Sequence, residues 1–289
     1  MTESESETVC GKLYLVGTPL GNLEDITYRA LRILGEVDLI AAEDTRHTLK
    51  LLNHFGIKRP LLSYHQHNER ERADGIIARI QSGLDVALVS DAGMPGISDP
   101  GQWLVAEALR QGIAVVPVPG PAALITALAA SGLDSSAFWF GGFLPRRPTE
   151  QLQQIERVKL FPGTLIWYEA PHRLEQTLKN IGSVLGDRPV VLARELTKVH
   201  EEFIRGTLSG VLEQLNHHEV RGEFTILVAG CSEPELDRQD STKPDLETLF
   251  NALDNKNGSL RENLKAIAQQ TGKSTREIYQ LYLEQKGQK

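Results

Sequence analysis

Short apolar runs rich in β-branched residues alternate with helical patterns over residues 12–120, and this alternation limits the possible folds. Strands are predicted by KLYLVGT, VDLIAAEDT, PLLSYHQ, VALVSDAG and AVVPVPG (12–18, 37–45, 60–66, 86–93 and 114–120). Helices are predicted between them by segments such as YRALRILGE (28–36) and GQWLVAEALRQG (101–112). A helix between two strands carries the chain back to the end of the sheet at which the first strand began. Successive strands then run in the same direction, so the pattern predicts a mainly parallel sheet.

A second series of elements begins after the sequence PGP at 119–121. Helices are predicted at 122–132 and 172–186, and strands at 138–144, 164–170, 189–195, 202–208 and 223–230. The fold class is therefore α/β, with one α/β domain expected at 1–118 and another at 119–232. A polar, proline-containing stretch then predicts a linker at 233–245.

The remaining residues, 246–289, predict a small helical module with a charge of its own. It carries seven basic and five acidic residues, whereas the whole chain has a net charge of −7. The stretch LRENLKAIAQQTGKSTREIYQLYL (260–283) resembles a helix-turn-helix, in which Gly272 ends one helix and Ser274 caps the next. Two interpretations stay open: an RNA-docking module with Lys273 and Arg276 at the turn, or a two-helix cap packed on the body.

Composition excludes several classes of protein. No apolar run approaches the roughly 18 residues of a membrane span, and the acidic opening MTESESETVC differs from a signal peptide, so a cytoplasmic location is expected. Cys10 and Cys231 lie far apart without a CxxC motif, so the sequence predicts neither a disulfide framework nor a metal site. The negative net charge argues against indiscriminate binding of nucleic acid.

Four polar motifs each follow a predicted strand of the first series. They are VGTPLGNLEDIT, AAEDTRHT, VSDAGMPGISDPG and VPGPAA (16–27, 41–48, 89–101 and 118–123). Any one of them is also explained as a tight turn or a helix cap. Because ligands bind at the carboxyl ends of parallel strands, the four together predict a ligand site.

The usual nucleotide-binding signatures are missing from these motifs. No GxGxxG follows the first strand, and TGKST (271–275) lacks the earlier glycine of a phosphate-binding loop. Glycine where backbone approaches a ligand, with proline fixing the loop, instead predicts a preformed pocket of main-chain donors and acceptors. Such a pocket suits a zwitterionic nucleoside.

Eight motifs, in order, carry a family resemblance: GTPLGNLEDIT, AAEDTRHT, VSDAGMPGISDPG, PGPAA, GGFLP, YEAPHRL, ARELTKVHEE and GEFTILV. Over roughly residues 12–230 the chain resembles the ribosomal RNA small subunit methyltransferase I family of the tetrapyrrole methylase superfamily. The resemblance implies two α/β domains of tetrapyrrole methylase type with a cofactor cleft between them. It also implies a homodimer that uses S-adenosylmethionine to methylate the 2′-oxygen of a cytidine in the decoding region of 16S rRNA.

The resemblance also implies which residues bind S-adenosylmethionine. The loop GMPGIS (93–98) is similar to the loop that lines the cofactor cleft of the superfamily. Carried over residue by residue, the expected contacts are Gly93, Met94, Ile97, Ala122, Ala123, Glu169, Phe224 and Thr225, with Pro19 and Leu20 at the border. Met94 departs from the family, which usually has threonine there; it lacks that hydroxyl, but main-chain contacts of the loop survive the change.

Transfer to a ribose hydroxyl requires a group that accepts the hydroxyl proton. A carboxylate or a neutral lysine within hydrogen-bond reach serves this role. The candidates are Glu43, Asp44, Glu195 and Lys198, which lie in the motifs EDTR and ELTK. Asp44 is the first choice, with a helix N-cap as its alternative role, and an ion-pair partner is the alternative role for Glu195.

Basic residues near the motifs are candidate contacts to RNA phosphates. They are Arg46, Arg146, Arg147 and Arg173, with His172 beside the last, and each is also explained as part of a solvated face. His65 and His67 lie in SYHQHNERER, which we interpret as a basic loop that contacts RNA rather than metal.

Two other functions stay open from sequence. One is a methyltransferase that acts on a small molecule or a protein side chain, as relatives in the superfamily do. The other is a ribosome-assembly factor that binds RNA without chemistry.

Overall fold

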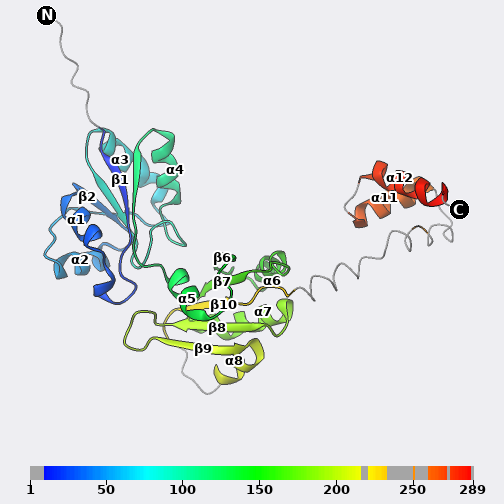
Figure 1. Ribbon diagram of the computed structural model, residues 1–289. Helices are drawn as coiled ribbons and strands as arrows, with labels where there is room; N and C mark the ends of the chain where they lie inside the picture. Colours follow the sequence, from blue (N-terminus) through cyan, green and yellow to red (C-terminus); the bar gives the residue numbers. More distant parts are fainter. Residues whose placement is uncertain (1–9, 216–220, 233–249, 251–259, 272–273, 288–289) are drawn as a thin grey trace, which may run out of the picture. The chain divides into compact units, whose positions relative to one another are not determined.

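The computed structural model describes residues 10–215, 221–232, 250, 260–271 and 274–287. The chain divides into two compact units, Met1–Gly230 and Cys231–Lys289. The first unit contains two five-stranded sheets (Figure 1). We call the part of this unit around the first sheet, residues 10–118, the first lobe, and the described part of residues 119–230 the second lobe. The domain boundary expected at 118 falls between the last strand of the first sheet and the next helix.

The sequence predicted a mainly parallel first sheet, and all four of its strand pairs are parallel. Its strands are β1 (Lys12–Val16), β2 (Leu39–Ala42), β3 (Leu61–Ser63), β4 (Val86–Val89) and β5 (Ala114–Val118), in the order β3-β2-β4-β1-β5. Helices α1 (Tyr28–Glu36), α2 (Thr45–His54), α3 (Glu69–Gln81) and α4 (Gln102–Arg110) lie between successive strands.

Side chains of the central strand β4 alternate between two apolar cores. Val86 and Leu88 pack with residues of α3 and α4, whereas Ala87 and Val89 pack with residues of α1 and α2. Both faces of the sheet are therefore covered, which explains why its strands read as continuous apolar runs.

The second sheet is mixed. Its strands are β6 (Phe138–Phe143), β7 (Thr164–Glu169), β8 (Pro189–Arg194), β9 (Glu202–Thr207) and β10 (Phe224–Val228), in the order β6-β7-β10-β8-β9. Only the β6–β7 pair is parallel; β7–β10, β10–β8 and β8–β9 are antiparallel. All five strands lie within the predicted ranges.

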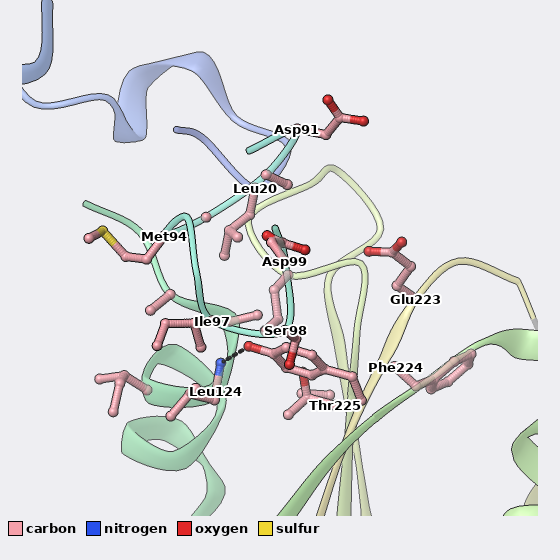
Figure 2. A pocket seen from close by; sticks show the side chains of 18 of the residues that line it. Leu20, Asp91, Met94, Ile97, Ser98, Asp99, Leu124, Glu223, Phe224 and Thr225 are labelled. Atoms are coloured by element: carbon pink, nitrogen blue, oxygen red, sulfur yellow. Dashed lines mark hydrogen bonds between the residues drawn. The ribbon is translucent and has the colours of Figure 1, made fainter. Parts of the chain in front are cut away.

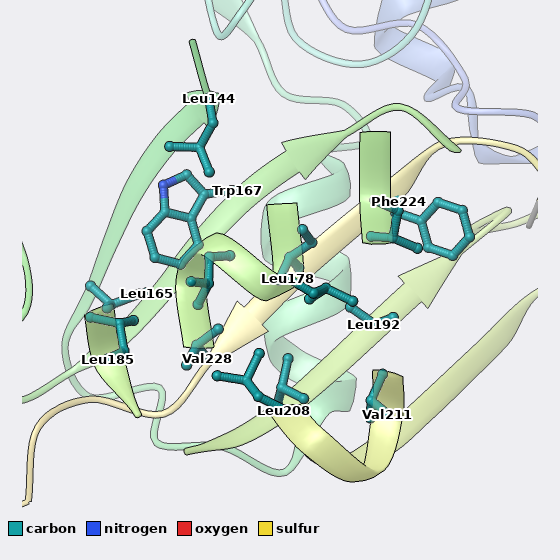
Figure 3. Packing of buried hydrophobic residues seen from close by; sticks show 14 of the residues in the cluster. Leu144, Leu165, Trp167, Leu178, Leu185, Leu192, Leu208, Val211, Phe224 and Val228 are labelled. Carbon is teal, nitrogen blue, oxygen red and sulfur yellow. The ribbon is translucent and has the colours of Figure 1, made fainter. Parts of the chain in front are cut away.

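Helices cover both faces of the second sheet. Helices α6 (Pro148–Arg157), α7 (Leu174–Leu185) and α8 (Leu208–Leu215) pack on one face around Leu165 and Trp167 (Figure 3). Helix α5 (Ala123–Ser131) packs on the opposite face against Ile166 and Leu227. Neighbouring residues of one strand thus belong to different cores, and only the side chains on one of the two faces can reach the site.

The structure corrects the interpretation of SYHQHNERER as a loop. Helix α3 already begins at Glu69, so only residues as far as Asn68 lie outside it. Asn68 ends the turn, and its side-chain oxygen accepts a hydrogen bond from the backbone NH of His65 at 2.8 Å. The helix forms because apolar residues that follow at helical spacing, Ala73, Ile76, Ile77 and Ile80, bury one of its faces, while the polar residues of its first turn stay outside the core.

The second unit contains the two helices predicted for the tail, α11 (Leu260–Thr271) and α12 (Thr275–Gly287). Phe250, Leu264, Ile267, Ala268 and Ile278 form its apolar core. Ser274 caps α12 as expected: its hydroxyl accepts from the NH of Glu277, and the Glu277 carboxylate accepts from the NH of Ser274. Gly272 and Lys273, as well as the expected linker at 233–245, lie outside the described residues.

None of the helices in the described part of the chain has the length and apolar content that a membrane crossing needs.

Candidate functional site

A pocket of about 500 Å³ lies where the loops of the first sheet meet the strand ends of the second, and Figure 2 shows it from close by. The first lobe contributes Leu20, Glu43, Asp91, Ala92, Gly93, Met94, Ile97, Ser98 and Asp99. The second lobe contributes Ala122, Ala123, Leu124, Ile125, Phe143, Tyr168, Ala193, Glu195, Leu196, Lys198, Glu223, Phe224 and Thr225. Its volume falls within the roughly 300–1,000 Å³ typical of ligand sites.

The loops after β1 and β4 are joined by their backbones. Thr18 and Gly93 exchange two hydrogen bonds, NH to carbonyl oxygen, at 2.9 and 3.0 Å. Gly93 has φ +87°, a conformation that glycine adopts without the steric cost that a side chain adds. The pocket wall at this point is therefore main chain, held in place by a two-bond bridge.

Close packing of the loops after β1 and β5 also depends on glycine. A Cβ atom on Gly17 would lie 2.7 Å from the Cα of Gly120, so neither residue accepts a side chain. These backbone contacts are consistent with the preformed pocket that the glycine-rich motifs predict.

Five carboxylates line the pocket: Glu43, Asp91, Asp99, Glu195 and Glu223, of which Glu195 is paired with Lys198. Burial raises the pKa of Asp99 to about 6, and the negative charges of Glu43, Asp91 and Glu223 act in the same direction. Burial, followed by the charge of Asp91, also raises the pKa of Glu43. Figure 2 shows the carboxylates of Asp99 and Glu223 facing the same space. The pocket is therefore electronegative and suited to a cationic group.

An aromatic side chain of the second sheet holds the first turn of α5 at the pocket wall. The Tyr168 hydroxyl oxygen accepts a hydrogen bond from the NH of Leu124 at 3.0 Å, as drawn in Figure 2. The N-cap residue of α5, Ala122, has no side chain that can cap the helix, so Tyr168 satisfies one of its free NH groups. Burial raises the pKa of Tyr168 to about 12, which keeps the hydroxyl neutral at physiological pH.

Glu195 and Lys198 form an ion pair at the pocket, with Nζ 3.0 Å from Oε1. A Cβ on Gly21 would lie 2.5 Å from Cγ of Lys198, and one on Gly222 would lie 2.0 Å from Oε1 of Glu195. Each member of the pair thus fits against a glycine. Glu195 therefore has the ion-pair role that was expected as its alternative.

Most of the residues expected to contact the cofactor line this one pocket. They are Leu20, Gly93, Met94, Ile97, Ala122, Ala123, Phe224 and Thr225, and of the four candidate proton acceptors Glu43, Glu195 and Lys198 line it too. Pro19 is buried beside Leu20 but is not part of the lining.

Glu169 lies outside the pocket lining. It is fully buried, and its carboxylate accepts from the Thr177 hydroxyl at 2.7 Å and lies 3.4 Å from Nη2 of Arg173. Successive strand residues face opposite sides, so Tyr168 reaches the pocket and Glu169 cannot do so from the same strand. Arg173 also donates to the carbonyl oxygens of Leu144 and Pro145, which gives it a structural role.

Asp44, the first choice for proton acceptor, also lies outside the lining. It is the N-cap of α2: Oδ1 accepts from the NH of Arg46 at 2.8 Å, and Oδ2 pairs with the Arg46 guanidinium at 2.8 Å. These bonds to Arg46 hold the pKa of Asp44 well below its usual range. The side chain has the N-cap role named as its alternative.

The other basic candidates are exposed. Arg46, Arg146, Arg147 and Arg276 all present their side chains to solvent, and Arg147 pairs with Glu150. Within the described residues, no group of three His, Cys, Asp or Glu side chains could hold a metal ion.

Sequence reasoning missed several lining residues. Asp91 and Asp99 stand in VSDAGMPGISDPG, where a polar residue at each end of a glycine-rich loop was the available signal. Phe143 and Tyr168 gave no such signal, because only the strand register turns them to the pocket. Glu223, directly before β10, was also missed.

Comparison with known proteins places the chain in a family. Residues 12–212 match the model of the Tetrapyrrole (Corrin/Porphyrin) Methylases. Proteins named ribosomal RNA small subunit methyltransferase I are 48% identical in Halalkalibacterium halodurans and 45% in Bacillus subtilis, each over 94% of both chains. The Escherichia coli O157:H7 protein of that name is 45% identical over 96% of both chains.

Solved structures of low identity share the fold. Cobalt precorrin-4 methyltransferase is 19% identical and superimposes with a TM-score of 0.57 over 75% of this chain and 94% of that one. Uroporphyrin-III C-methyl transferase from Thermus thermophilus, complexed with S-adenyl homocysteine, is 23% identical, with a TM-score of 0.53 over 75% and 97%. Together with the sequence matches, these findings show that the chain belongs to the tetrapyrrole methylase family and, within it, to the ribosomal RNA small subunit methyltransferase I group.

Proposed function

We propose that this protein transfers a methyl group from S-adenosylmethionine to 16S ribosomal RNA, and that the acceptor is the 2′-hydroxyl of a cytidine in the decoding region. The observation that carries the proposal is the identity of 48% and 45% with relatives named ribosomal RNA small subunit methyltransferase I, over 94% of this chain. The nature of the acceptor nucleotide rests on the family resemblance of the eight motifs.

The residues of the pocket fit S-adenosylmethionine. That molecule carries a cationic sulfonium and an ammonium group, and the carboxylates of Glu43, Asp91, Asp99 and Glu223 line the pocket. Apolar side chains such as Leu20 and Leu124, and the main chain at Gly93, supply the walls that a nucleoside needs. When bound, the sulfonium supplies an activated methyl group, so the protein has to orient the acceptor and remove its proton.

We take Asp99 as the proton acceptor, because its carboxylate lines the pocket and faces the same space as that of Glu223 (Figure 2). Burial, with the charge of Glu43, raises the pKa of Asp99 to about 6, so the carboxyl is ionised at neutral pH yet more basic than an ordinary carboxylate. Glu43, a candidate from sequence, acts on it through charge, because the Glu43 carboxylate raises the pKa of Asp99. Asp44 takes no part in this scheme, since its carboxylate is bound to Arg46.

Lys198 is suited to hold a phosphate of the RNA. Its side chain is 40% exposed at the pocket and pairs with Glu195, and a phosphate can replace that carboxylate as its partner. Exposed Arg46, Arg146 and Arg147 provide further positive charge for the RNA backbone, and Arg276 does so in the second unit. A homodimer, expected from the superfamily, completes the proposal.

The test uses small ribosomal subunits from a strain that lacks the gene. Purified protein and S-adenosylmethionine with a labelled methyl group should place one label on 16S rRNA, at the 2′-oxygen of a cytidine. Label on a ribosomal protein would instead favour the protein side chain as substrate. Absence of S-adenosylmethionine binding in calorimetry would favour a non-catalytic assembly factor.

A further inference from the structure

The motif GGFLP contains an exposed aromatic residue to which the methyl transfer described above gives no role. Phe143 lines the pocket, and 49% of its surface is exposed. Ile97 and Ile125 are exposed to a similar degree, whereas Phe224 and Thr225 are only 2% and 3% exposed. Phe143 therefore lies at the rim, where a substrate enters, and the buried residues form the floor.

A β-bulge turns Phe143 toward this rim. Phe140 pairs with Ile166, so regular pairing would set Gly142 opposite Tyr168, but the register shifts by one residue and Phe143 takes that place. Without the shift, Phe143 would lie beside Glu169 and point into the core under α6 and α7. Bulges of this kind re-aim side chains next to active sites.

Two glycines make the bulge possible. Gly142 has φ +60°, and a Cβ on it would lie 2.9 Å from Oγ of Ser98 in the loop after β4. A Cβ on Gly141 would lie 2.5 Å or less from ring carbons of Trp139. A side chain at Gly142 would disturb the contact of β6 with the first lobe, and one at Gly141 would disturb the packing of Trp139 and Trp167 within the second lobe.

The ring of Phe143 is supported from behind by other aromatic rings. It meets Tyr168 edge-on, with centroids 5.7 Å apart, and Phe140 meets the same tyrosine at 4.9 Å. Tyr168 is in turn fixed by its hydrogen bond to Leu124. The rim thus presents an aromatic surface that is already ordered, which lowers the entropy lost on binding.

We propose that Phe143 is the stacking platform for the base of the nucleotide that receives the methyl group. The inference rests on the proposed function. Single-stranded RNA is recognised by stacking unpaired bases on aromatic side chains, and enzymes that modify a nucleotide take it out of its stack. A base on Phe143 would place its own ribose toward the pocket, where Asp99 lies.

The experiment compares Phe143→Leu with Phe143→Tyr and with Phe138→Leu. Phe138 is a matched control, because it is 41% exposed at the other end of the same strand and lies outside the pocket lining. Single-turnover methyl transfer is measured against the concentration of small subunits from the strain lacking the gene. Calorimetry with S-adenosylmethionine and thermal unfolding are measured in parallel.

Phe143→Leu should raise the half-saturating subunit concentration by roughly 5- to 150-fold, the range that loss of one base–aromatic stack produces. Phe143→Tyr and Phe138→Leu should behave as the wild type, and all three variants should bind S-adenosylmethionine normally. An unchanged half-saturating concentration in Phe143→Leu overturns the inference. A parallel loss of cofactor affinity also overturns it, since the ring would then contact the cofactor.

These readouts separate the two proposals. A wild-type protein that does not label 16S rRNA refutes the proposed function and this inference with it. If the wild-type protein labels the RNA and Phe143→Leu has the same half-saturating subunit concentration as the wild type, only the stacking role is refuted.

Discussion

The two walls of the pocket are built in different ways. The first lobe contributes loops that directly follow parallel strands, and it presents main chain at Gly93 together with the carboxylates of Glu43, Asp91 and Asp99. The second lobe contributes mainly residues of strands and strand ends, among them Phe143 and Tyr168.

This difference assigns different tasks to the walls. Loops held by backbone bridges, such as Thr18–Gly93, place charge and main chain where a cofactor and a proton acceptor are needed. Strand side chains form a broad, ordered surface suited to a substrate base. Changes at Asp99 and Gly93 in the first wall should therefore affect chemistry and cofactor affinity, and changes at Phe143 in the second should affect substrate binding.

The largest expected effect belongs to Asp99 in the first wall. Asp99→Asn should slow single-turnover methyl transfer by about 10²- to 10⁴-fold, as is typical when a general base is lost. In the wild type the rate should rise with pH through about 6, where the carboxyl ionises, and then level off. Asp44→Asn is the control: the amide caps α2 about as well, so the rate should stay near that of the wild type. Equal losses in both variants would refute the assignment.

The next effect concerns main chain in the same loop. Gly93→Val should weaken S-adenosylmethionine binding by roughly tenfold. The left-handed backbone conformation of Gly93 costs a residue with a side chain about 1–2 kcal/mol, so valine should shift the backbone that forms the pocket wall. Gly96→Val is matched, since Gly96 has φ +81° in the same loop but is not part of the lining. Calorimetry should show reduced affinity only for Gly93→Val, whereas both variants should unfold at lower temperature.

A smaller effect is expected at the junction of the second wall and α5. Tyr168→Phe removes the acceptor for the NH of Leu124 and should lower the free energy of unfolding by about 0.5–1.5 kcal/mol. Chemical denaturation measures this, with Tyr28→Phe as control because Tyr28 is 94% exposed. An equal change in both variants would mean that the bond contributes nothing measurable.

The smallest effect is a pH dependence of stability. The folded-state pKa of Asp99, about 6, lies above the ordinary value near 3.8, so the folded protein binds this proton more tightly than the unfolded chain. The group's contribution to stability is therefore fully present below pH 3.8 and is lost as pH rises through 6. Asp99→Asn should remove this loss, so that the variant is at least as stable as the wild type at pH 8. Thermal unfolding at pH 5 and pH 8 measures the difference.

The sequence by itself determined the strands and the position of the first wall, but it did not predict helices α6 and α8. Short apolar runs rich in β-branched residues are local properties, so every strand lies within its predicted range. The glycine-rich loop at 93–98 and Glu43 were also found, because a parallel sheet brings the carboxyl ends of its strands to one edge.

Only the tertiary structure decided which of two neighbouring residues faces the site. Tyr168 rather than Glu169 lines the pocket because the pairing of β7 sets the face, and a one-residue shift turns Phe143 outward from the core. Asp44 and Asp99 both follow predicted strands, yet one caps α2 beside Arg46 and the other is half-buried in the pocket near other carboxylates. Local sequence specifies alternation along a strand, whereas register and burial depend on contacts between distant segments, and these contacts assign each carboxylate its role.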